Sequence, residues 1–394
     1  MSIAPSASIL DEVVDVRRQL HRHPEVAHEE SWTTDFIESR MRELGLHLPG
    51  RLTPTGSLGL LDTGRPGRTV MIRADIDALP LQEESGLAFS SDLDGRMHAC
   101  GHDGHAAIAL ATARTLAEHL EDLRGRFLFC FQPAEEIGSG AREMIAAGIL
   151  ERHQPDLVLG LHLAAFLPAG QVLTRPGLLW AGADAFTITM TGPGGHGGMM
   201  GRSGNVIAAQ AFCLERLGQV VLGLEHEGTR CHIAVGAVHS DGLWNVVSRQ
   251  IRIEGSLRTF NPDLRRQALE RLAALLAECD AEFNIFCELG LTHRTSPLIN
   301  HPRVTSRVLE SARELVGESA VQLSTPLTVS DDMAEFLTQV PGCYLMLGAQ
   351  PRDAEGPVAH HSPGFRIEED CLQTGVRVLS LAASRLADPS LTAD

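Results

Sequence analysis

The chain has 394 residues, a formal net charge of −17 and 43% hydrophobic residues. This length exceeds what a single hydrophobic core usually supports, so we expect two domains. The negative charge argues against nucleic acid and against an anionic membrane surface as partners, because both attract basic faces. All 33 basic residues are arginine, and without lysine the chain can have neither Schiff-base chemistry nor a phosphate-binding Walker loop.

The first ten residues lack the basic segment and apolar stretch of a secretory signal. No apolar run approaches the ~20 residues that a membrane-spanning helix needs. The eight cysteines are scattered without a Cys-x-x-Cys pair, which is typical of reduced thiols in a reducing compartment. We therefore expect a cytoplasmic protein without a membrane partner.

The first part of the chain alternates apolar runs with helical patterns. Such alternation predicts an α/β layer built on a mainly parallel sheet. The expected strands cover residues 57–61, 69–72, 126–131 and 156–163, with helices at 102–120 and 139–147.

The pattern changes between about residues 185 and 290. There the order of expected elements is β-α-β-β-α-β, which is the split βαβ arrangement of a ferredoxin-like domain. The α/β pattern then resumes, with a helix at 303–316, a strand at 344–347 and a closing helix at 368–386. We therefore predict a discontinuous first domain of residues 1–181 and 295–394, with a second domain of residues 182–294 inserted into it.

Cys100 and His102 lie in a tight turn that opens the predicted helix 102–120. Both side chains can reach one side of this turn, and a thiolate with an imidazole suits Zn²⁺ or a similar divalent ion. The alternative is a buried thiol beside histidines that cap the helix.

Glu135 and Glu136 follow the apolar strand 126–131. Neighbouring residues of an extended chain point in opposite directions, so one carboxylate can bind metal while the other takes a proton from water. Functional groups of α/β proteins collect at the carboxyl ends of the strands. For an isolated pair of glutamates, a solvated acidic loop is the alternative.

Two further histidine patterns follow along the chain. His162 ends the apolar run that begins at Leu157, and His360 and His361 precede a Pro-Gly turn. Each alone is typical of a structural histidine. Together with the two earlier patterns they supply ligand types for a divalent metal, and three of the four patterns stand at expected strand ends, so we expect one metal site.

The glycine-rich segment 192–197 has the Gly-x-Gly-x-x-Gly spacing of a dinucleotide-binding loop. That fold requires a helix to open within the segment, so that its N-terminus holds the pyrophosphate. The residues that follow, 198–204, are typical of a loop, so we do not expect nucleotide binding.

These residues resemble the M20 metallopeptidase superfamily, and in particular its amidohydrolase branch of hippurate hydrolases, aminoacylases and indole-3-acetyl-amino-acid hydrolases. The resemblance runs from about Arg17 to Leu386. The stretches that carry it are RRQLHRHPEVAHEE (17–30), RADIDALP (73–80), MHACGHDGH (97–105), FQPAEE (131–136), LH (161–162), GPGGHGG (192–198) and HSP (361–363).

The resemblance implies a zinc-peptidase-like catalytic domain that holds two divalent ions per chain, Zn²⁺ or Mn²⁺, with Co²⁺ and Ni²⁺ as further options. It implies that residues 182–294 form a lid and dimerisation domain, so that the protein is a homodimer or a higher oligomer. Carried over by position, the metal ligands are Cys100, His102, Glu136, His162 and His361, the general base is Glu135, and the substrate-binding residues are His196, Asn245 and Arg258.

Asp75, Asp77 and Asp103 are expected to fix the ligand histidines through hydrogen bonds, although each could instead cap a turn. The chain departs from the family at Met199-Met200-Gly201, where a Pro-His pair is usual. It departs again at Asn245-Val246-Val247-Ser248 and at Ser330-Asp331-Asp332-Met333. These departures leave the acyl group and the amino acid of the substrate open.

The resulting hypothesis is metal-dependent hydrolysis of the amide bond of N-acyl amino acids or short peptides, with Glu135 as general base. A dipeptidase or an N-carbamoyl hydrolase with the same site is one alternative. A catalytically silent, metal-binding dimeric scaffold is a second alternative from a different class. The ligand positions are all filled, which favours an enzyme.

Overall fold

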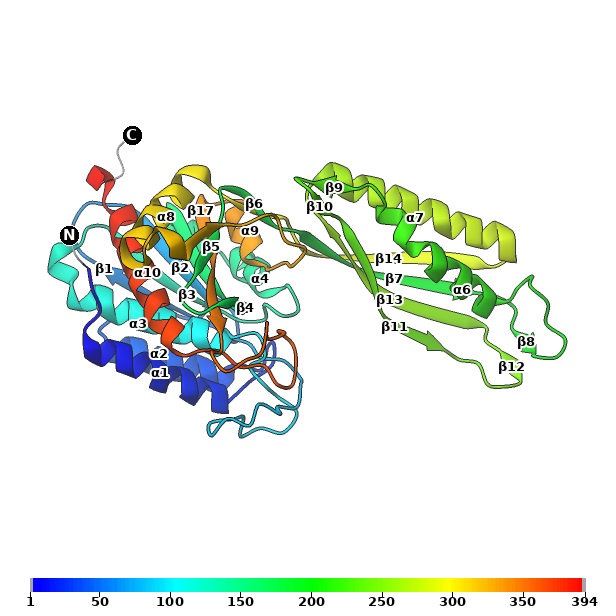
Figure 1. The fold of residues 1–394 in the computed structure, drawn as a ribbon, viewed down its shortest axis with the longest axis horizontal. Coiled ribbons are helices and arrows are strands. Elements are labelled where there is room, and N and C mark those ends of the chain that lie inside the picture. The colour runs from blue at the N-terminus through cyan, green and yellow to red at the C-terminus, as the bar shows by residue number, and fades with distance from the viewer. Residues whose placement is uncertain (1–2, 392–394) are drawn as a thin grey trace. The chain divides into compact units, whose positions relative to one another are not determined.

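The computed structural model describes residues 3–391 and divides into two compact units (Figure 1). Unit 1 comprises Met1–Gly177, Ile299–Ser324 and Asp332–Asp394, and unit 2 comprises Leu178–Leu298 and Thr325–Asp331. The outer bounds of the predicted first domain, residues 1 and 394, lie outside the described residues. The strands β6 (Gly177–Trp180) and β15 (Leu298–Asn300) stand where the chain passes from one unit to the other.

Unit 1 is built on a seven-stranded sheet, and its α/β class agrees with the prediction. Four neighbouring pairs are parallel, β2 with β3, β2 with β4, β4 with β17, and β5 with β16, whereas β1–β3 and β5–β17 are antiparallel. In spatial order the strands are β1 (Ser57–Asp62), β3 (Arg126–Gln132), β2 (Thr69–Asp75), β4 (Leu157–Pro168), β17 (Gly342–Gln350), β5 (Val172–Thr174) and β16 (Val321–Leu323).

Helices bury this sheet on both faces, which explains the continuous apolar runs of its central strands. All seven residues of β2 are buried. Val70, Ile72 and Ala74 join the core under the helices, and Arg73 points to the other face because side chains alternate along a strand. The helices of unit 1 are α1 (Ala7–Arg22), α2 (Ser31–Glu43), α3 (His102–Glu118), α4 (Gly140–Ala146), α5 (Ile149–His153), α8 (Pro302–Val316), α9 (Met333–Leu337) and α10 (Asp370–Ala387).

Strand β4 is longer than predicted, which corrects the expected position of His162. The sequence interpretation ended this strand at Leu163, directly after the apolar run. In the structure, β4 keeps pairing with β17 beyond that point, with Ala164 opposite Gly348 and Pro168 opposite Gln350. His162 therefore lies inside a strand rather than at its end.

Unit 2 follows the predicted β-α-β-β-α-β order. Its four main strands form an antiparallel sheet in the order β11-β13-β7-β14, and Phe186, Ile188 and Met190 of β7 share a core with both helices. The elements are β7 (Gly182–Thr191), α6 (Val206–Leu217), β11 (His232–Ser240), β13 (Gln250–Thr259), α7 (Pro262–Phe283) and β14 (Phe286–Thr295), with the short strands β8 (Gly195–His196), β9 (Glu225–His226), β10 (Thr229–Arg230) and β12 (Val246–Val247).

The role of unit 2 as a lid or dimerisation domain stays a prediction. Within residues 3–391, no helix combines the length and the apolar character needed to cross a membrane.

Candidate metal centre

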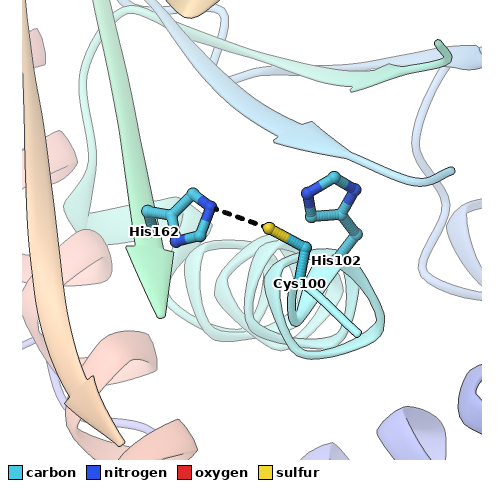
Figure 2. Close-up of side chains that lie close together, drawn as sticks. All are labelled: Cys100, His102 and His162. Carbon is cyan, nitrogen blue, oxygen red and sulfur yellow. Dashed lines mark hydrogen bonds between the residues drawn. The ribbon is translucent and has the colours of Figure 1, made fainter. Parts of the chain in front are cut away.

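The five predicted metal ligands converge at one place in unit 1. The Cys100 Sγ atom lies 3.4 Å from His162 Nε2 (Figure 2) and 3.3 Å from His361 Nε2. Glu136 closes the group, because its Oε2 lies 3.5 Å from His361 Nε2 and its Oε1 lies 3.8 Å from His102 Nε2. Three overlapping trios each have their ligand atoms within 4.8 Å of one another: Cys100, His102 and His162; Cys100, Glu136 and His361; and His102, Glu135 and Glu136.

Three residues in or next to the proposed ligand motifs have positive φ angles. Gly101, between Cys100 and His102, has a φ of 96°, a conformation that glycine adopts at little cost. Ala134, just before the glutamate pair, and His361 itself also have positive φ values, 55° and 57°. Non-glycine residues adopt this region rarely, and such strain is typical of functional sites.

The ring nitrogens that face the cluster fit a bound cation. His102 donates from Nδ1 to the backbone carbonyl of Asp77 at 2.8 Å, and His162 donates from Nδ1 to the carbonyl of Leu163 at 2.6 Å. In both rings the Nε2 atom is left to face the cluster. Among the described residues, the buried His102 Nε2 and Glu136 Oε1 atoms have no hydrogen-bond partner. Buried polar atoms without partners are costly, so these two atoms fit the binding of a cation between them.

The pKa values of the cluster depend on burial and on the charges of neighbouring side chains. Burial raises the pKa of Glu136 to about 7, and burial together with the Glu136 charge holds the pKa of the Cys100 thiol well above its usual range. Burial is the largest single effect and lowers the pKa of His102, but Asp75, Cys100 and Asp77 together outweigh it and raise this pKa well above the ordinary value. A bound divalent ion would reverse these tendencies by favouring the thiolate, the carboxylate and the neutral imidazole.

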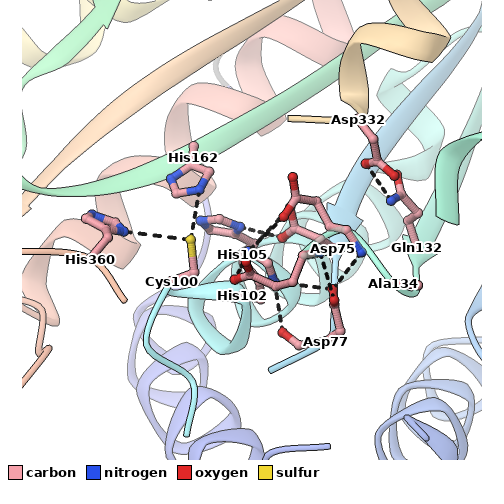
Figure 3. Close-up of polar contacts among 12 residues, drawn as sticks. Asp75, Asp77, Cys100, His102, His105, Gln132, Ala134, His162, Asp332 and His360 are labelled. Carbon is pink, nitrogen blue, oxygen red and sulfur yellow. Dashed lines mark hydrogen bonds and ion pairs between the residues drawn. The ribbon is translucent and has the colours of Figure 1, made fainter. Parts of the chain in front are cut away.

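Asp77 positions both the glutamate pair and His102. Its carboxylate accepts hydrogen bonds from the backbone N–H groups of Glu135 and Glu136, each at 3.0 Å, and its backbone carbonyl holds His102 (Figure 3). The backbone carbonyl of Asp77 thus orients the His102 ring, and the role of Asp77 in fixing a metal ligand stays a prediction. The Asp77 carboxylate, in addition, fixes the loop after β3 through the N–H groups of Glu135 and Glu136.

Asp75 also contacts histidines, but mainly one that the sequence reading did not single out. Its Oδ1 accepts a hydrogen bond from His105 Nδ1 at 2.6 Å, whereas His102 Nε2 lies 3.8 Å from its Oδ2. His105 Nε2 in turn accepts the N–H of Leu163 at 2.8 Å. Both ring nitrogens of His105 are thus engaged, and this residue ties α3 to the strand that carries His162.

His360, which the sequence analysis named beside His361 without a role of its own, also faces the cluster. Its Nδ1 lies 3.8 Å from Cys100 Sγ, and its Nε2 accepts the N–H of Ala165 at 3.1 Å. The ring is therefore oriented to donate to the sulfur. His105 and His360 both belong to sequence motifs that contain candidate metal ligands. Their position in these motifs could have indicated that they lie near the site.

The prediction that Asp103 fixes a ligand histidine is wrong. The Asp103 carboxylate accepts hydrogen bonds from Arg17 Nε and from His21 Nδ1, both at 2.8 Å. Arg17 and His21 belong to α1. A step of one residue turns a helix by about 100°, so Asp103 faces α1 while His102 faces the cluster.

The predicted substrate-binding residues lie in unit 2 and do not form one group there. His196 of β8 pairs with Val246 of β12, and the Gly197 N–H donates to the Asn245 carbonyl at 2.9 Å. Arg258 lies near the end of β13, where its guanidinium donates to Ser330 Oγ. The extended strand from Gln250 to Arg258 places it roughly 25 Å from the end at which β8 and β12 lie. The glycine-rich segment 192–197 contains β8 rather than the start of a helix, and the next helix begins only at Val206. This agrees with the expected loop.

Comparison with known proteins agrees with this geometry. The model of peptidase family M20/M25/M40 matches residues 71–385. The chain belongs to this family. It is 32% identical to the IAA-amino acid hydrolase ILR1-like 2 of Arabidopsis thaliana, over 96% of this chain and 86% of that one. It is 31% identical to the N-acetyl-L-cysteine deacetylase of Bacillus subtilis, over 96% and 88% of the two chains.

Among solved structures, the M20-family chain is similar to the Bacillus subtilis YXEP protein, described as a dinuclear metal binding peptidase from the M20 family. The TM-score is 0.80 at 28% identity, and the match covers 97% of this chain and 99% of that one. These findings confirm the resemblance and the α/β fold with its mixed sheet. They also show that this M20-family chain is a hydrolase with a candidate metal centre.

Replacement of Asp77 by asparagine should lower the metal content of the purified protein. The amide would turn an N–H group toward one of the two backbone N–H groups that the carboxylate now binds, so the Glu135–Glu136 loop loses its anchor. Elemental analysis after dialysis against a fixed metal concentration measures the effect. Asp241→Asn is the matched control, since Asp241 accepts the N–H groups of Arg249 and Gln250 in unit 2. Equal metal content in both variants would remove Asp77 from this role.

Proposed function

We propose that the chain hydrolyses the amide bond of N-acyl amino acids in a metal-dependent reaction. The observation that carries this proposal is the collection of Cys100, His102, Glu136, His162 and His361 around Glu135 in one group, in which Cys100 and His102 are buried and His361 is exposed. Its relatives include proteins named as an N-acetyl-L-cysteine deacetylase and as an IAA-amino acid hydrolase. The reaction class follows from the site, and the substrate class follows from these relatives.

The proposed site holds two divalent ions, because five ligands exceed the four of a closed single zinc site. Zn²⁺ and Mn²⁺ are our first candidates, and Co²⁺ and Ni²⁺ the next. Such ions supply Lewis acidity and lower the pKa of water from 15.7 to about 7. The mixed donor set of one thiolate, three imidazoles and one carboxylate suits these borderline metals rather than Mg²⁺ or Ca²⁺.

Glu135 is the proposed general base. Its backbone is fixed by Asp77, and its Oε2 lies 3.9 Å from His102 Nε2, at the edge of the ligand group. Its side chain is 11% exposed, so water can reach it. In the proposed reaction Glu135 accepts a proton from the attacking water and delivers it to the departing amine.

Three residues of unit 2 are proposed to bind substrate. A guanidinium matches a carboxylate with two parallel hydrogen bonds, so Arg258 suits the α-carboxylate that all N-acyl amino acids share. His196 and Asn245 are neighbours beside the separate two-stranded sheet of β8 and β12, beyond the opposite end of β13. Because one copy of unit 2 holds Arg258 and His196 roughly 25 Å apart along β13, we propose that they serve different active sites of a homodimer.

Glu135→Gln should reduce turnover of N-acetyl amino acids at least 100-fold, the size expected for loss of a general base, while metal content stays close to that of the wild type. Glu136→Gln should instead lower metal content. Hydrolysis assays with added Zn²⁺, Mn²⁺, Co²⁺ or Ni²⁺, combined with elemental analysis, separate the two effects. Glu143→Gln, at a half-exposed site beside His28, is the control. A Glu135→Gln protein that keeps its activity or loses its metal would overturn the assignment.

Arg258→Ala should raise the KM for N-acyl amino acids strongly and leave the hydrolysis of a matched amide without a carboxylate nearly unchanged. The matched control is Arg252→Ala, because Arg252 lies on the same strand and on the same side, where it pairs with Glu254 at 2.9 Å. Steady-state kinetics on both substrates measures the difference. Equal losses on the two substrates would mean that Arg258 does not bind the carboxylate.

Mixing an inactive His196→Ala chain with an inactive Glu135→Gln chain should restore partial activity. In a mixed dimer, one site receives an intact Glu135 from one chain and an intact His196 from the other. The assay requires co-expression with two affinity tags, so that mixed dimers are isolated before activity is measured. Isolated mixed dimers without activity would place His196 in the site of its own chain or outside catalysis.

A further inference from the structure

Unit 1 contains a cavity of about 310 Å³ at the edge of the sheet where its parallel strands begin. Arg68 precedes β2, Leu157 is the first residue of β4, and Pro341 precedes β17. The start of α8 and Leu386 near the end of α10 complete the lining. The candidate metal centre lies beyond the opposite end of β2, and the seven residues of this strand span roughly 20 Å. This cavity is therefore separate from the proposed catalytic site.

The charged groups that line the cavity are all basic. They are Arg68, Arg303 and Arg307, with His301 beside them, and no carboxylate is among the lining residues. This is a local reversal of charge in a chain whose net charge is −17. Within residues 3–391, no ion pair involves Arg303. Such a concentration of guanidinium groups raises the local positive potential and attracts anions.

The acidic groups of the surrounding elements are mostly engaged elsewhere. Glu310 of α8 is the exception, because it pairs with Arg307 at 3.0 Å. Asp156, next to Leu157, accepts the backbone N–H of Thr69 at 2.7 Å. Asp388, after α10, accepts the N–H and hydroxyl groups of Ser390 at 2.9 and 2.7 Å. Of the three guanidinium groups that line the cavity, Arg307 thus has a carboxylate partner, and Arg68 donates to the backbone carbonyl of Leu386 at 3.2 Å.

The arrangement is electrostatically unfavourable without an anion. Arg303 and Arg307 are four residues apart on α8, so their like charges lie on one face of the helix and repel each other. Both lie in the first two turns, where the helix dipole is positive and cations are disfavoured. The first turn of α8 carries no acidic residue, and its N-cap is the His301 side chain. A bound anion would relieve all of these repulsions at once.

We propose that this cavity binds a phosphate group, carried either by inorganic phosphate or by a phosphate monoester. A dianion matches several guanidinium groups better than a monoanion does, and arginine binds phosphate oxygens in pairs of hydrogen bonds. The volume of about 310 Å³ is roughly ten times the 30 Å³ share of one water molecule. The cavity is therefore large enough for a phosphate and part of the group that carries it.

The test is titration calorimetry of the full chain with inorganic phosphate after chelation of metal, at constant ionic strength set with chloride. Chelation removes the ions that would themselves bind phosphate. The expected result is one saturable site per chain, with affinity at least tenfold weaker in the variant Arg303→Gln/Arg307→Gln. Arg313→Gln is the matched control, because Arg313 lies in the last turn of the same helix and pairs with Glu318 at 3.0 Å; its affinity should equal that of the wild type.

A second variant tests the same site by a gain of affinity. Glu310→Gln removes the carboxylate that competes for Arg307, so phosphate binding should become several-fold tighter. Parallel titrations with glycerol 3-phosphate distinguish the sources: tighter binding of the monoester indicates an organic phosphate, and exclusive binding of inorganic phosphate indicates the free ion.

Two results would overturn the proposal. One is the absence of saturable phosphate binding by the wild type. The other is unchanged affinity in a folded double variant, verified by circular dichroism. If the double variant does not fold, unchanged affinity in Glu310→Gln would count against the site.

Discussion

The buried guanidinium of Arg73 is the interaction on which the rest of the site depends. Arg73 is 2% exposed, and it donates to Asp75 at 2.7 Å and to Gln132 and Asp332 at 2.8 Å each. A buried charge is tolerated only when it is paired and fully hydrogen-bonded. These partners lie at the carboxyl ends of β2 and β3 and at the start of α9, so a single cation joins three segments that are distant in the sequence.

From Arg73 a chain of polar contacts reaches the proposed metal ligands. Asp75, held by Arg73, accepts a hydrogen bond from His105, and His105 accepts the N–H of Leu163 next to His162. Asp77, two residues along, fixes His102 and the glutamate pair. The ligand geometry is therefore set by groups behind the ligands, which is how metal sites keep their side chains oriented.

Strand β1 and the central strands of the sheet could be located from the sequence because strands buried on both faces give continuous apolar runs. The end of β4 could not be located from the sequence, because His162 and the residues after it interrupt the apolar run. Pairing of β4 with β17 nevertheless continues. Helix α1 was not predicted, although Ile9, Val13, Val16 and Leu20 follow helical spacing and are buried.

The candidate metal site could be located in part because Cys100 stands beside His102 and Glu135 beside Glu136 in the sequence. The proposed ligand set itself came from the family resemblance. The supporting contacts were not predictable in the same way. Asp103 meets Arg17 across 86 residues of chain, and which side of α3 faces α1 is decided by tertiary packing. The sequence therefore indicated residues that can bind a metal, whereas the contacts of Asp103 depend on tertiary packing.

The most direct test of the central claim is anomalous diffraction at the zinc edge from crystals of the protein grown with Zn²⁺. The account predicts two strong peaks per chain, both within bonding distance of side chains from the set Cys100, His102, Glu136, His162 and His361. A single peak at this position, no peak, or strong peaks bound only by other residues would contradict the proposed two-ion centre.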